Sequence, residues 1–255
     1  MPARAVGAFL FLLLLLPPSG WGAIRSDGTD TQHLAGPAGG SPGSGAVTLL
    51  QWHKLNVDHK AAKLLFQYHN NAHGGSAHAI ILYTQPDGRT LDVSTFVDVV
   101  PHQTAAGAQS IAVNTWYFYA LVRDRSTIRL YVGSEGSDVG LVATLTDSRL
   151  QAQSTAWRWT ATGTSTAGYS ADASIERLKV YNAALSLAQI EAERCNRTPS
   201  SRARLWSYNE FTMAGSYDGQ DGASPWRFTA QGGGNFSTVA GPSPRCAGAA
   251  PPSRP

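Results

Sequence analysis

Short runs of alternating or continuous apolar residues fill the chain from Val47 onward. VTLLQWHKL, AKLLFQYH, HAIILYTQ and RTLDVSTFVDVV follow one another, and turn residues such as Pro86-Asp87-Gly88 separate them. Runs of this length between clusters of Gly, Pro, Asn and Asp are typical of β-strands. The pattern therefore predicts a series of short strands joined by tight turns.

A hairpin with one buried side is predicted between residues 116 and 132. Every second residue is apolar on both of its strands, and Asp124-Arg125-Ser126 provides the turn. The apolar positions are Trp116, Phe118, Ala120 and Val122 on the first strand and Ile128, Leu130 and Val132 on the second. Further along, Leu178 and Val180 add an inward-facing pair. Together these patterns predict a two-sheet β-sandwich.

A short helix is predicted to follow the last of these strands. Ser186 is a suitable N-cap and Gln189 stands three residues later, which is the spacing of a capping box. Leu185 and Ile190 occupy the positions of a hydrophobic staple. The helix from Leu187 to Arg194 has about two turns, too few to be stable alone in water, so we expect it to dock onto a sheet.

Two ordered stretches resemble the laminin G-like, or concanavalin A-like, jelly-roll modules. They are NTWYFYALVRDRSTIRLYVGSEG and, about forty residues later, SIERLKVYNAALSLAQIEAE. The resemblance covers about residues 46–194 and implies an antiparallel jelly-roll β-sandwich with one short helix. The family's opening strand, of the type W-x-F-D-E, is missing before Val47, but WSYNEF occurs at 206–211. The tail either supplies a closing strand of the sandwich or forms a separate β appendage.

The two ends of the chain differ in composition from its middle. One basic residue precedes an apolar run over 6–16, and small residues follow it, so residues 1–22 are interpreted as a signal peptide. Residues 23–45 are interpreted as a linker rich in Gly, Pro and Ser, residues 46–194 as the jelly-roll domain, and residues 195–255 as a C-terminal β extension with a disordered tail. The expected mature protein is secreted, extracellular and without a membrane span.

The cysteine count fits an exported protein. Cys195 and Cys246 are the two cysteines of the chain, and pairing with each other is the favoured interpretation, with two unpaired buried thiols as the alternative. Asn196 and Asn235 begin formal N-glycosylation motifs, which matter only in a eukaryotic secretory pathway.

Composition and charge support these interpretations and argue against one class of partner. Charged residues make up 15% of the chain, which has 26 Gly and 14 Pro, as expected for a turn-rich β protein. The net charge is +3 and the basic residues are scattered. No basic run marks a nucleic-acid surface, so we expect no nucleic-acid partner.

No catalytic residue is predicted. Jelly-roll glycosidases carry clustered carboxylates because hydrolysis needs two carboxyl groups at a fixed separation. Here the five glutamates are dispersed, at Glu135, Glu176, Glu191, Glu193 and Glu210. His69, His73 and His78 could bind zinc if a hairpin brings them together, but a loop of solvent-facing imidazoles is the simpler interpretation.

Binding chemistry is better represented in the sequence. Trp157 and Trp159 flank Arg158, and aromatic rings on one side of a strand can stack on sugars or fill the core. Asp218 and Asp221 are weak calcium candidates and otherwise turn residues; no other cofactor is expected. We therefore predict a secreted, non-catalytic module that binds glycans or glycoproteins through loops at the sandwich rim. An extracellular polysaccharide hydrolase or lyase is the alternative.

Overall fold

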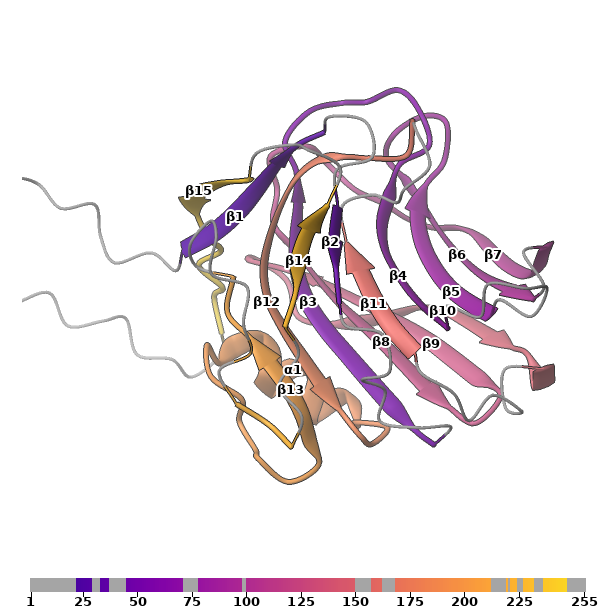
Figure 1. Cartoon of the computed structure of the whole chain (residues 1–255), viewed down its shortest axis with the longest axis vertical. Coiled ribbons are helices and arrows are strands. Elements are labelled where there is room, and N and C mark those ends of the chain that lie inside the picture. Colours follow the sequence, from indigo (N-terminus) through magenta and orange to yellow (C-terminus); the bar gives the residue numbers. More distant parts are fainter. Residues whose placement is uncertain are drawn as a thin grey trace, which may run out of the picture.

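Two antiparallel sheets pack face to face in the computed structural model of the chain, with one short helix against the outer side of one sheet (Figure 1). The described residues are 22–28, 33–36, 45–70, 78–97, 100–149, 157–161, 168–211, 219, 221–223, 227–231 and 236–246. Every pair of neighbouring strands in them is antiparallel. The predicted fold class, an all-β jelly-roll sandwich with one short helix, is confirmed.

The first sheet has eight strands in the order β10-β9-β8-β3-β12-β1-β15, and β13 pairs with β12 off this path. Its strands are β10 (Gly140–Thr146), β9 (Thr127–Ser134), β8 (Tyr117–Asp124), β3 (Val47–Leu55), β12 (Asp172–Tyr181), β1 (Gly22–Asp27), β15 (Phe236–Ala240) and β13 (Leu205–Asn209). The central strands β3 and β12 are buried on both faces. Strand β3 is largely apolar, whereas β12 also buries charged residues that form ion pairs, namely Asp172, Glu176, Arg177 and Lys179.

The second sheet has seven strands in the order β14-β2-β11-β4-β5-β6-β7. Its strands are β14 (Thr229–Gln231), β2 (His33–Ala35), β11 (Trp157–Ala161), β4 (Leu64–Asn70), β5 (His78–Thr84), β6 (Thr90–Val97) and β7 (Val100–Ser110). Phe66, Tyr68, Ile80, Leu82 and Val93 turn one face of it toward the first sheet. The alternating residues on these strands lie on its other face, away from the core.

The sandwich extends beyond the boundaries predicted for it. The segment 23–45, interpreted as a linker, contains β1 and β2, one in each sheet. The tail likewise contributes β13 and β15 to the first sheet and β14 to the second. Strand β1 lies between β12 and β15, so the two ends of the domain meet in one sheet. These strands are three to six residues long, too short to show a clear alternation of their own in the sequence. The predicted signal peptide 1–22 falls almost wholly outside the described residues and stays a prediction.

The predicted hairpin is correct in its pairing and wrong in its burial. Strands β8 and β9 pair as expected, and Phe118, Ala120 and Val122 share one face. That face belongs to a cluster on the helix side of the sheet, whereas Leu130 and Val132 lie in the core between the sheets. The hairpin is therefore buried on both sides. Ile190 of α1 packs into this cluster, so the helix covers part of the face that a lone sandwich would expose to water.

The predicted helix is present as α1 (Leu187–Cys195) and begins with the expected capping box. The Ser186 hydroxyl accepts a hydrogen bond from the Gln189 amide, and the Gln189 side chain accepts one from the Ser186 amide at 2.9 Å. Ile190 is fully buried in the helix-side cluster, and Leu185 packs against the same cluster. Within the described part of the chain no helix is long and apolar enough to cross a bilayer.

Ion pairs, more than apolar contacts, join α1 to the sheet. The helix buries one large apolar residue, Ile190, together with Glu193 and Arg194. Glu193 lies 2.6 Å from the Lys179 amine on β12 and also accepts a hydrogen bond from the Tyr181 hydroxyl at 2.6 Å. In a free helix the Glu193 carboxylate would face water. It meets Lys179 and Tyr181 only when α1 is docked on the sheet.

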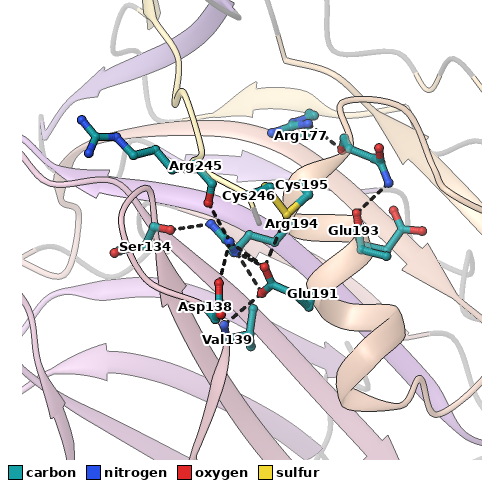
Figure 2. The surroundings of a disulfide bond; sticks show 12 residues. Ser134, Asp138, Val139, Arg177, Glu191, Glu193, Arg194, Cys195, Arg245 and Cys246 are labelled. Carbon is teal, nitrogen blue, oxygen red and sulfur yellow. Dashed lines mark hydrogen bonds and ion pairs between the residues drawn. A yellow bond between two sulfur atoms is a disulfide. The ribbon is translucent and has the colours of Figure 1, made fainter. Parts of the chain in front are cut away.

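The predicted disulfide between Cys195 and Cys246 is present and attaches the C-terminal segment to the end of α1 (Figure 2). Beside it, the buried guanidinium of Arg194 binds both carboxylate oxygens of Glu191, at 3.0 and 2.9 Å. Arg194 also donates to the carbonyl groups of Ser134, at 2.8 Å, and Arg245, at 3.1 Å. One side chain thus connects the helix, the loop after β9 and the C-terminal segment.

Three polar side chains of the first sheet face the core between the sheets. Gln51 and His53 on β3 and Tyr119 on β8 are each at most 2% exposed. Their polar side-chain atoms have no hydrogen-bond partner among the described residues. The His53 and Tyr119 rings pack edge to face, with centroids 6.2 Å apart. Burial removes water from the imidazole and lowers the pKa of His53 to about 3.

The His53 imidazole is expected to destabilise the fold in acid. The pKa in the unfolded chain is about 6.5, so between pH 6.5 and 3 the unfolded state binds more protons and the free energy of unfolding falls as pH falls. From pH 7 to 4 this loss is about 3 kcal/mol. The variant His53→Gln should lose correspondingly less over the same interval, measured by urea unfolding at each pH. Equal losses in both proteins would contradict a neutral buried imidazole.

Candidate functional site

A groove of about 500 Å³ lies on the face of the second sheet that points away from the core. It runs across β4, β5, β6 and β7, and its size is that of small-molecule sites. Register brings its residues together: Gln67 lies opposite Ile81, Ile81 opposite Ser94, and Ser94 opposite Thr104. Directly paired residues of an antiparallel sheet share a face, so this row crosses four strands.

Aromatic and aliphatic side chains line most of the groove. Its lining residues are Ala62, Leu64, Gln67, Ile81, Tyr83, Phe96, Pro101 and Tyr169. None of these eight carries a charge. Tyr169 comes from the segment before β12 and is 47% exposed. A hydrogen bond of 3.0 Å from the Leu64 amide to the Tyr169 carbonyl fixes that segment beside β4.

A chain of hydroxyl groups stiffens one side of the groove. The Tyr83 hydroxyl lies 3.1 Å from the Ser94 hydroxyl, which lies 2.8 Å from that of Thr104. Gln85, directly after β5, donates to the carboxylate of Asp92 on β6 at 2.9 Å. The Tyr83 ring is therefore held in one orientation before any ligand arrives, which reduces the entropy lost on binding.

The predicted aromatic strand is a neighbour of this groove. Strand β11 pairs with β4, with Thr160 opposite Gln67 and Arg158 opposite His69. The side chains of Trp157, Arg158 and Trp159 lie outside the described residues, so their role stays a prediction. Sequence reasoning missed Tyr83, Phe96 and Tyr169. Alternation in β5 and β6 marked which residues share a face. It did not show that Phe96 and Tyr83 lie near Tyr169, which comes 73 and 86 residues later in the chain.

The other predicted site residues do not meet at this groove. Asp221 forms an ion pair with Arg202 at 2.8 Å, and Asp218 lies outside the described residues, so calcium binding stays a prediction. Asn196 is exposed after α1, and Asn235 lies outside the described residues. Glycosylation of either stays a prediction.

The zinc hypothesis for the histidines is weakened by the strand register. His69 lies opposite Ala79 rather than His78, and His73 lies outside the described residues. Glu191, Cys195 and Cys246 are the one cluster of metal-ligand type among the described residues, and its two sulfur atoms are bonded to each other.

The groove can hold a ligand with flat apolar faces and hydroxyl groups. Aromatic rings stack on the apolar faces of sugar rings, and the Gln67 amide offers both a donor and an acceptor. No carboxylate is among the described lining residues, whereas glycoside hydrolysis uses a pair of carboxyl groups about 5 to 10 Å apart. The described lining residues therefore offer stacking and hydrogen-bonding contacts, and no carboxylate pair is among them.

This fold and groove define a jelly-roll β-sandwich protein of the lectin-like class. The sequence matches the family model of the laminin G-like type, described as the concanavalin A-like lectin/glucanases superfamily, over residues 27–191. The chain belongs to this family. A comparison with curated protein sequences finds no match.

Solved structures of low sequence identity share the fold. A candidate carbohydrate-binding protein from Bacteroides ovatus ATCC 8483 has a TM-score of 0.59 at 13% identity, covering 89% of this chain and 62% of that one. A heptameric SAP-like pentraxin from Limulus polyphemus has a TM-score of 0.53 at 17% identity, covering 88% and 95%. The enzymatically active domain of tailspike protein 2 from bacteriophage CBA120 has a TM-score of 0.52 at 12% identity, covering 72% and 29%. The chain thus spans less than two thirds of the first of these proteins.

Proposed function

We propose that this protein is an exported, non-catalytic module that binds neutral glycans in the groove across β4 to β7. One observation carries the proposal: an uncharged groove with three aromatic residues, Tyr83, Phe96 and Tyr169, on the open face of a lectin-like sandwich. This differs from the rim loops expected from the sequence, because the groove lies on the face of a sheet.

Two further features support the proposal. The structure of similar fold from Bacteroides ovatus is described as a candidate carbohydrate-binding protein. The disulfide between Cys195 and Cys246 and the apolar N-terminal run both suit an extracellular location. A glycan or glycoprotein surface outside the cell is the partner that these features favour.

The test of this proposal uses protein secreted by a host cell. The full sequence is expressed in a secreting host, and the protein recovered from the medium is expected to begin near residue 23. On an array of neutral polysaccharides it should be retained by at least one. Replacing Tyr169 with alanine should weaken that binding by about fivefold to thirtyfold, because a stacked ring contributes about 1 to 2 kcal/mol.

Leu141→Ala is the matched control, because Leu141 is 53% exposed on β10 of the other sheet. It should bind as the unchanged protein does. Equal affinity of the Tyr169→Ala protein would place the ligand elsewhere. Steady release of reducing ends or unsaturated products from a retained polysaccharide would contradict the proposal and favour the hydrolase or lyase instead.

A further inference from the structure

A second pocket, of about 400 Å³, lies beside β13 of the first sheet and shares no residue with the groove. The segment 221–223 forms one wall by docking onto β13 in the manner of an extra strand. The Tyr208 amide donates to the Asp221 carbonyl at 2.9 Å, and the Ala223 amide donates to the Leu205 carbonyl at 3.2 Å. The pocket is therefore built by backbone hydrogen bonds.

Gly222 makes this close approach possible. Its φ is +117°, and a Cβ atom there would stand 2.4 Å from the Trp206 carbonyl oxygen. Any other residue would push the segment 221–223 away from the strand. Glycine therefore occupies the position where the segment 221–223 lies closest to Trp206, and Trp206 also lines the pocket.

Two arginines and one aspartate set the charge of the pocket. Arg202 pairs with Asp221 at 2.8 Å, so these two charges offset each other. Arg204 also lines the pocket, is exposed, and has no hydrogen bond or ion pair from its guanidinium among the described residues. One positive charge is thus left uncompensated, which suits a ligand with one negative charge.

The backbone fixes the position of Arg204. Its φ is +65°, a left-handed conformation that costs free energy for a residue other than glycine. The conformation is held by a hydrogen bond of 2.8 Å from the Asn182 amide to the Arg204 carbonyl. Asn182 follows β12 and lines the same pocket, so it adds an amide side chain beside the guanidinium.

We propose that this pocket binds a carboxylated sugar of the uronic acid type. A guanidinium can bind both oxygens of a carboxylate through two parallel hydrogen bonds, which is the strongest single contact that this set of residues offers. Leu205 and Trp206 line the pocket and supply apolar surface for the sugar ring, and Asn182 offers an amide partner for a hydroxyl. The protein thereby has two sites of different charge preference, a neutral groove on one sheet and an anion pocket beside the other.

The test measures binding of D-glucuronate to the full disulfide-bonded protein by isothermal titration calorimetry at low salt. D-Glucose and acetate are titrated as separate probes. Glucuronate is expected to bind at least about tenfold more tightly than either, because it alone combines the carboxylate with the ring. Equal binding of glucose would overturn the anion pocket, and equal binding of acetate would overturn the sugar class.

Two variants change the charge of the pocket in opposite directions. Arg204→Gln should weaken glucuronate binding about tenfold, because it removes the uncompensated charge. Asp221→Asn should strengthen it several-fold, because it frees Arg202. Loss of folding cannot produce both results. Arg149→Gln, a change of the same kind at an exposed arginine after β10, should leave binding unchanged.

An unchanged affinity of a folded Arg204→Gln protein would overturn the proposal. The calorimetry tests this pocket separately from the neutral groove, because Tyr169→Ala should not alter glucuronate binding. Failure of the polysaccharide array would likewise leave the glucuronate result standing.

Discussion

Replacing Glu193 with alanine is expected to lower the free energy of unfolding by about 3 to 5 kcal/mol. Glu193 is 2% exposed and lies 2.6 Å from the Lys179 amine and 2.6 Å from the Tyr181 hydroxyl. It also accepts from the Ser200 amide at 2.9 Å. Without its carboxylate, the buried Lys179 ammonium group loses its ion-pair partner and keeps only backbone carbonyl acceptors, those of Glu193, Asn196 and Thr198. The Tyr181 hydroxyl keeps only the Ser201 carbonyl. Urea unfolding followed by circular dichroism measures the loss.

The cause of this loss can be separated from simple loss of packing. Burial lowers the pKa of Lys179 to about 8, which shows how unfavourable the charged amine is where water is excluded. The double variant Lys179→Met with Glu193→Leu removes both charges, so we expect it to recover most of the lost stability. If the double variant is as unstable as Glu193→Ala, the ion pair is not the cause.

The ion pair between Arg194 of α1 and the exposed carboxylate of Asp138 provides the matched control. Asp138 is 77% exposed and lies 3.3 Å from the guanidinium of Arg194. Asp138→Ala removes a carboxylate in the same way as Glu193→Ala does. Because water and salt screen the exposed carboxylate, and Arg194 keeps its bonds to Glu191 and Ser134, the loss of Asp138 should change the free energy of unfolding by less than about 1 kcal/mol.

Reduction of the disulfide is expected to lower the free energy of unfolding by about 4 kcal/mol. The two cysteines are 51 residues apart in the sequence, and the bond restricts the unfolded chain in proportion to the logarithm of that separation. The enclosed segment contains β13, β14 and β15, so both sheets depend on its position. Urea unfolding with and without dithiothreitol measures the difference.

A variant without thiols is the control for the reductant. The chain has two cysteines, so Cys195→Ser with Cys246→Ser removes every thiol. Its stability should match that of the reduced protein and should not change with dithiothreitol. Equal stabilities of the oxidised and reduced proteins would mean that the pairing of β15 with β1, together with the bonds of Arg194 and Glu135, holds the C-terminal segment without the disulfide.

The predicted strands from Val47 to Val132 were recovered because each carries its own signal. Leu130 and Val132 alternate with polar residues, and Asp124-Arg125-Ser126 ends one strand before the next begins. The α1 cap was found in the same way, since Ser186 and Gln189 lie three residues apart and contact each other. These interactions join residues only a few positions apart, so the local sequence pattern is enough to predict them.

The short strands at the ends of the domain carry no such signal. Strand β2 has three residues and β14 has three, and each is a strand because it pairs with a partner far away in the sequence. The groove has the same origin. Ile81, Phe96 and Tyr169 belong to different segments, and they become one surface when the second sheet forms and the segment before β12 joins its edge.

The sequence by itself determined the class of fold, the capped helix and the pair of cysteines that bond. Each of these follows from alternation, spacing or composition, which are local properties. The tertiary structure alone decided which faces are buried, how Lys179 and Glu193 meet, and where the groove and the arginine pocket lie. Those features depend on strand order and register, which are fixed by contacts between residues distant in the chain.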